Sequence, residues 1–114
     1  MKDIYVKDGN LFIVPNAAQK AETIIETIQN LVKNSKPESI TVNLCGLNMF
    51  DALKIASLTG AYGLVNNLNN RYEIIVDDEV TMMQIKLLSL SNVKVRLEKE
   101  TKTPQKVREL VVVV

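Results

Sequence analysis

The stretch ITVNLCGLNMFDALKIASLTGAYGLV, residues 40–65, decides the fold because it changes from a strand pattern to a helix pattern at one point. Residues 40–45 are mostly apolar and rich in β-branched side chains, which is typical of an interior strand. From Ala52 onward, apolar and small residues recur at helical spacing. In open α/β sheets, ligands and partners usually meet the protein where a strand ends and the next helix starts. The sequence therefore points to residues 46–51 as the place to look for function.

The residues before this stretch predict a hairpin and a helix. Two apolar runs, Ile4–Val6 and Leu11–Val14, flank an Asp8-Gly9 pair, which is a strong hairpin signal. Asn16 and Gln19 have the spacing of a capping box. We therefore expect the apolar stripe from Ala18 to Val32 to form a helix that packs on the sheet, with Ile28 in the core.

The residues after the stretch predict two more strands with a helix between them. Tyr72–Val76 is typical of a buried strand, and Asp77 and Asp78 are helix-start residues. The next helix has a broad apolar face, composed of Val80, Met83, Ile85, Leu87 and Leu88. Val93–Glu98 alternates strictly and predicts an edge or half-exposed strand.

The order of elements predicts one α/β domain over residues 1–114. We expect a central mixed or mostly parallel sheet of four to five strands, right-handed crossovers and an N-terminal hairpin. Residues 52–65 should pack on the sheet, with Leu64 buried. The end of the chain is open to two interpretations: Gln105–Leu110 as a short last helix, or a strand drawn in by the run of valines at 111–114.

Composition excludes several classes of partner. The chain has 14 Lys and Arg against 13 Asp and Glu, a net charge of +1, so it lacks the concentrated basic surface that nucleic acid or an acidic membrane needs. No apolar run approaches the roughly 20 residues of a membrane helix, and the N-terminus lacks a secretory signal. A lone cysteine, Cys45, cannot form an internal disulfide and is compatible with the cytoplasm.

The residues that usually carry catalysis or bind metals are missing or have simpler explanations. There is no histidine. We expect Cys45 to be a buried packing thiol and the acids 77–79 to serve the helix start rather than Mg²⁺. Gly60 and Gly63 form no phosphate loop and should instead allow a close approach of this helix to the sheet or to another helix. We therefore expect no catalytic residue, cofactor or metal.

Met49 and Phe50 are the more informative pair. They either belong to the core and hold the helix start, or are exposed anchors for a protein partner, a use that suits Met and aromatic side chains.

The order of elements from about residue 10 to residue 98 resembles the STAS domain, the fold of bacterial anti-sigma-factor antagonists. The resemblance rests on the patterns of residues 11–14, 40–51, 58–62, 74–76, 80–90 and 93–95. That family places a phosphorylatable Ser or Thr directly after the Asp at this helix start, whereas here Asp51 is followed by Ala52, which has no hydroxyl. Ser57 and Thr59 lie a turn or more deeper in the helix and are not equivalent. The resemblance therefore implies a single STAS-like domain without the usual phospho-switch.

Two functional classes remain. The first is a non-catalytic protein-interaction module, a STAS-like regulatory or scaffold protein of the bacterial cytoplasm. Its partner would be another protein, such as the regulatory kinase or anti-sigma-like factor that the resemblance implies, and self-association stays open. Its predicted partner-binding residues are Leu47, Asn48, Met49, Phe50, Asp51, Ala52, Leu53 and Lys54. The alternative is a small-ligand binder or enzyme with a pocket at the carboxyl ends of the strands, after Cys45 and Val76. The lack of histidine, of a phosphate loop and of a paired nucleophile and base favours the first class.

Overall fold

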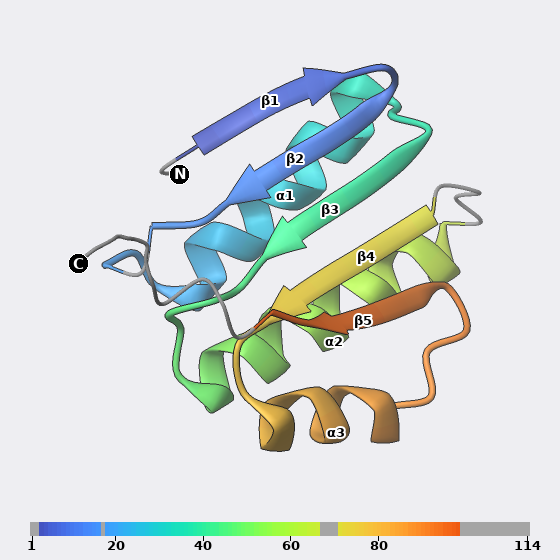
Figure 1. Ribbon diagram of the computed structural model, residues 1–114. Helices are drawn as coiled ribbons and strands as arrows, with labels where there is room; N and C mark the ends of the chain where they lie inside the picture. Colours follow the sequence, from blue (N-terminus) through green and yellow to red (C-terminus); the bar gives the residue numbers. More distant parts are fainter. Residues whose placement is uncertain (1–2, 17, 67–70, 99–114) are drawn as a thin grey trace.

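The described part of the chain forms a five-stranded sheet with three helices (Figure 1). The computed structural model describes residues 3–16, 18–66 and 71–98. The elements in chain order are β1 Asp3–Lys7, β2 Asn10–Val14, α1 Ala21–Ser35, β3 Ser39–Asn43, α2 Met49–Val65, β4 Arg71–Val76, α3 Glu79–Leu87 and β5 Val93–Leu97. The α/β class and the mixed sheet with its N-terminal hairpin are confirmed. The prediction for residues 105–114 lies outside the described residues.

The strands lie in the sheet in the same order as in the chain. β1 and β2 pair antiparallel, and β2, β3, β4 and β5 pair parallel. Asp8 and Gly9 both have positive φ at the hairpin turn, as the Asp-Gly pair predicts. Helices α1 and α2 lie behind the sheet in Figure 1, and α3 lies below the edge strand β5, where it contacts α2. Successive right-handed crossovers in one direction place their helices on the same face of a sheet. The other face of the sheet carries no helix of the described chain.

The core lies between the sheet and the helix layer. Alternate residues of the inner strands point into it, among them Leu11, Ile13, Ile40, Val42 and Ile74, which are nearly inaccessible. Helix α1 contributes Ile24, Ile28 and Val32 to the same cluster, and helix α2 contributes Ala52, Ile55 and Ala56. The burial expected of Ile28 is therefore confirmed.

Helix α2 sits close to its neighbours because of its glycines. A Cβ on Gly60 would lie 2.8 Å from Leu90 Cδ1 and 2.9 Å from Val93 Cγ2, closer than real Cβ contacts. A Cβ on Gly63 would lie 2.9 Å from Asn92 Nδ2. The predicted role of these glycines in close approach is confirmed, and the neighbour is the segment that leads into β5.

Both of the first two helices begin elsewhere than predicted. Helix α1 starts at Ala21 and its N-cap Lys20 makes no side-chain cap, so the predicted capping box is wrong. Asn16 instead accepts a hydrogen bond from the Ala18 N–H in a local turn, which leaves Ala18 exposed and outside the helix. Helix α2 starts at Met49, three residues before the predicted Ala52, because Asn48 provides the cap.

Several predictions of burial are also wrong. Leu64 is 43% exposed rather than buried. Of the broad apolar face expected on α3, Ile85 alone is buried, whereas Val80, Met83, Leu87 and Leu88 are exposed. Cys45 is partly exposed rather than buried, because it lies two residues beyond the end of β3 and one beyond the buried Leu44.

Candidate functional site

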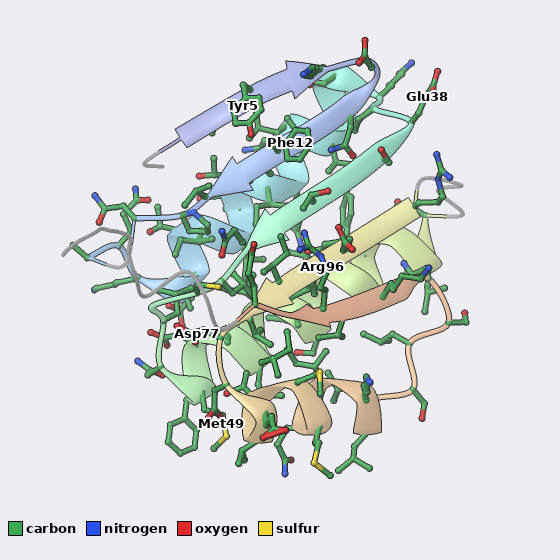
Figure 2. All side chains as sticks on the ribbon, viewed as in Figure 1. Tyr5, Phe12, Glu38, Met49, Asp77 and Arg96 are labelled. Carbon is green, nitrogen blue, oxygen red and sulfur yellow. The ribbon has the colours of Figure 1, made fainter. Side chains whose placement is uncertain are left out.

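The loop between β3 and α2 is held in place by the loop that follows β4. The Asn43 side chain accepts a hydrogen bond from the Cys45 N–H at 3.0 Å, which turns the chain at the strand end. The Gly46 N–H then donates to Asp77 Oδ2 at 3.1 Å, so a carboxylate after β4 fixes the loop after β3. Gly46 has a φ of 90°, a backbone conformation that glycine adopts without strain. Figure 2 shows Asp77 at this end of the sheet, above Met49.

A reciprocal pair of side chains fixes the start of helix α2. Asn48 Oδ1 accepts the Asp51 N–H at 2.9 Å, and Asn48 Nδ2 donates to Asp51 Oδ2 at 3.1 Å. The cap is therefore Asn48, and Asp51 supports it from the first turn, where a carboxylate also interacts favourably with the helix dipole. The first turn of α2 is preorganised.

The predicted site residues differ sharply in their access to a partner. Ala52 is 1% exposed and cannot contact one, so its inclusion is wrong. Leu47 and Leu53 are partly buried against the core, and Met49 is also partly buried. Phe50 is 78% exposed, so the interpretation as a core residue is wrong for this side chain. The apolar surface available on this segment is therefore concentrated on Phe50.

Lys54, expected as a charge at the rim of the site, is engaged within the protein. Its ammonium forms an ion pair with the Glu22 carboxylate across the α1–α2 contact. The hydrogen bond from Lys54 lowers the pKa of the Glu22 carboxyl below its ordinary value. Both side chains are largely exposed, so the pair orients Lys54 more than it stabilises the fold.

The strand order of the described sheet has no switch point at the carboxyl ends of the strands. Ligand sites of open α/β sheets lie where the strand order reverses and helices leave to opposite faces. Here the order β1-β2-β3-β4-β5 never reverses. A concavity of about 690 Å³ lies instead over the amino-terminal halves of the parallel strands. Its lining includes Asn10, Ser39, Thr41, Arg71, Glu73 and Lys94.

The helix-free face of the sheet is mostly polar. Tyr5 and Phe12 stack on it with ring centroids 4.9 Å apart, and Figure 2 shows them side by side on β1 and β2. Farther across, Arg96 Nε donates to Glu73 Oε2 at 3.3 Å between β5 and β4. This polar surface explains how the face can remain in contact with water.

The exposed apolar surface of the helix layer was missed by the sequence reasoning. Large apolar side chains of α2 and α3 that were assigned to the core face solvent instead, among them Leu64 and Met83. A signal was available: residues 55–65 contain no charged side chain, although a helix with one solvated face normally carries several. Helix α1, with Glu22, Glu26 and Lys33 exposed, follows the normal pattern.

Of the acids expected to serve the start of α3, Asp78 has that role, whereas the Asp77 carboxylate binds the loop after β3. Asp78 Oδ2 accepts hydrogen bonds from both the N–H and the hydroxyl of Thr81, each at 2.9 Å. Within the described residues, no three Cys, Asp or Glu side chains gather as metal ligands. The same part of the chain contains no helix with the length and apolar character required to cross a membrane. Comparisons with protein-family models, with curated proteins and with solved structures found no match.

Proposed function

We propose that this protein is a non-catalytic protein-interaction module, with its main binding surface at the start of helix α2. Its principal support is Phe50, a large aromatic side chain 78% exposed on a helix turn that Asn48 and Asp51 hold rigid. An aromatic anchor on a preorganised element loses little conformational entropy on binding, and such residues dominate interface energies. The sequence resemblance to STAS domains favours a regulatory or scaffold role.

Control of this surface by phosphorylation at the helix start is not part of the proposal. Ala52 is buried and has no hydroxyl, and Ser57, farther along the helix, donates its hydroxyl proton to the Lys54 carbonyl at 3.2 Å. Mass spectrometry of protein from its native cell should find no phosphate between residues 46 and 54.

A capture experiment with matched variants tests the proposal. Tagged protein is used to retrieve partners from an extract of the native cell, with Phe50→Ser compared against Tyr5→Ser. Tyr5 is also aromatic and is 52% exposed, but it lies on the opposite side of the sheet. Phe50→Ser should reduce the captured partner at least about tenfold, because truncating a central interface anchor costs about 2 kcal/mol or more, and about 1.4 kcal/mol already corresponds to tenfold.

The stability of both variants is measured alongside. Equal capture by Phe50→Ser and the unsubstituted protein would contradict the assignment of the surface, and equal loss with Tyr5→Ser would mean that the effect is not specific to α2.

A second candidate function, small-ligand binding, is favoured by the concavity of about 690 Å³ on the helix-free face. Arg71 and Lys94 at its rim suit an anionic ligand. A ligand that copurifies with the protein and is lost on Arg71→Gln would support this candidate over the first.

A further inference from the structure

The outer surface of the helix layer is polar over α1 and apolar over α2 and α3. Of the large apolar side chains that are exposed in the described chain, most belong to these two helices and the residue that ends α3. They are Phe50, Leu58, Leu64, Val65, Val80, Met83, Leu87 and Leu88. We call this set the helical apolar face.

Helical spacing places several of these residues on one side. On α3, Val80, Met83 and Leu87 follow the i, i+3, i+7 pattern of a single face, opposite the buried Thr81 and Ile85. Helices α2 and α3 contact each other directly.

On α2, the side turned away from the sheet carries two large residues with small ones between them. Phe50 and Leu64 lie at its two ends, about 21 Å apart along the helix axis. Ser57 and Ala61, both partly exposed, lie between them within the same arc of the helix. Lys54 lies in this arc too, and its ammonium pairs with Glu22 of α1. The surface therefore has two projections separated by a shallower centre.

The exposed area is of the size that stable protein interfaces use. Taking about 150 to 200 Å² for a fully uncovered large side chain, the eight residues expose roughly 700 to 950 Å². The largest apolar patch on a typical monomer is about 300 to 600 Å², and each partner of a standard interface contributes about 800 Å². The helical apolar face thus suffices for one side of a standard interface.

We infer that a second copy of this chain covers the helical apolar face, with the two α2 helices antiparallel across a twofold axis at Ser57. The inference rests on the proposed function, because it names the partner that Phe50 contacts. Residues 50 and 64 lie equally far from residue 57 along the chain, and so do 53 and 61. In the antiparallel pair, Phe50 of each copy therefore meets Leu64 of the other, and Leu53 meets Ala61.

Two features of α2 favour a second copy over an unrelated protein. A twofold interface brings the same surface together from both sides, so it must be complementary to itself. Residues 55–65 carry no charge, and Lys54, which lies on the same side of α2, is neutralised by its ion pair with Glu22. The pairing therefore brings no unpaired like charges together. The small side chains at the centre, Ser57 and Ala61, let the helices approach closely while the large ends fill the flanks.

Sedimentation equilibrium of the purified chain tests the oligomeric state. The protein should be a dimer at micromolar concentration, and Leu64→Glu and Met83→Glu should each weaken dimerisation at least about 100-fold, since each buries an unpaired carboxylate in the contact. Val6→Glu is the matched control, because Val6 is 58% exposed on β1, at the edge of the sheet opposite β5, and should leave the dimer intact.

Disulfide trapping tests the position of the axis. Residues on the axis of two helices packed 8–10 Å apart have Cα atoms within about 6 Å, the range that a disulfide spans. Ser57→Cys in a Cys45→Ser background should therefore form a covalent dimer under mild oxidation. Thr23→Cys in the same background, exposed on α1, should not.

The outcomes separate this inference from the proposed function. A purified protein that is monomeric at all concentrations but still captures a different partner through Phe50 overturns the second copy and leaves the interaction module standing. A dimer that neither Leu64→Glu nor Met83→Glu weakens, or that Ser57→Cys does not trap, overturns the α2 interface. A monomer that captures no partner overturns both.

Discussion

Thr59 and Tyr72 share a buried hydrogen bond, and removing one partner should cost more stability than removing the other. Both residues are buried: Thr59, on the inner side of α2, is 4% exposed, and Tyr72, on β4, is 5% exposed. The Thr59 hydroxyl donates to the Ile55 carbonyl at 2.6 Å and also contacts the Tyr72 hydroxyl. Tyr72→Phe leaves Thr59 with an acceptor and should cost about 0.5–1.5 kcal/mol, the net value of one hydrogen bond.

Thr59→Val should be worse, because it leaves the buried Tyr72 hydroxyl without a partner. The expected cost is about 1–3 kcal/mol, the penalty for an unsatisfied buried polar group. The double variant removes both hydroxyls and leaves no unsatisfied group. It should therefore be more stable than Thr59→Val alone.

Urea unfolding of the four proteins measures the coupling energy as a double-mutant cycle. Thr27→Val is the matched control: its hydroxyl also donates to the carbonyl four residues earlier, Thr23 O at 2.8 Å, but on the outside of α1. It should change stability by less than about 0.5 kcal/mol. If the stability losses of the two single variants add up to the loss of the double variant, the reasoning is refuted, because the two hydroxyls then do not depend on each other.

Four further predictions follow from individual residues. Ile28→Ala should lower the free energy of unfolding by about 2–5 kcal/mol, because Ile28 is 1% exposed. Leu64→Ala should lower it by under about 1 kcal/mol in the monomer, because Leu64 is 43% exposed. Urea unfolding of both variants at low protein concentration checks the difference. Gly60→Ala should gain about 1 kcal/mol of helix propensity, but it also drives a methyl group into the side chains of Leu90 and Val93, which should cost about 1–3 kcal/mol. Thermal unfolding should therefore show a net loss of stability. Asn48→Ala should lower stability by about 1 kcal/mol through loss of the α2 cap, and a gain on substitution would contradict the cap. Burial raises the pKa of Tyr72 above its ordinary value, so the folded state holds this proton more tightly than the unfolded state does. The free energy of unfolding should therefore be at its full value below the unfolded pKa of about 10 and should fall as the pH rises above it. The fall should be less steep in Tyr72→Phe.

The strand and helix types were predictable because they depend on local periodicity and turn chemistry. The Asp8-Gly9 hairpin and the edge strand from Val93 are set by patterns within a few residues. Helix starts were less predictable, since Asn16, Asn48 and Asp51 are all acceptable caps and the choice among them depends on the tertiary structure. From the sequence, the first cap is expected at Asn16 and the second helix pattern starts at Ala52, whereas Asn48 caps α2.

The candidate site was predictable in place but not in its residues. The strand-to-helix junction is marked in the sequence, and Phe50 within it is exposed. The burial of Ala52 depends on how α2 packs in the core, and the pairing of Lys54 depends on Glu22, 32 residues away. The outer face of α2 was missed because apolar residues occur all around this helix, so periodicity does not say which of them face the sheet.

The order of strands in the sheet has a consequence for how the chain folds as it is made. Each strand hydrogen-bonds to the strand before it in the sequence, so β1 to β4 can pair, with α1 and α2 in place, before residues beyond 77 leave the ribosome. Pairing between strands that are neighbours in the sequence also closes shorter loops than pairing in a sheet whose late strands insert between early ones. The entropic cost of forming each strand pair is therefore lower. The last strand to join, β5, carries Lys94 and Arg96, and charged residues on an edge discourage a neighbouring chain from continuing the sheet.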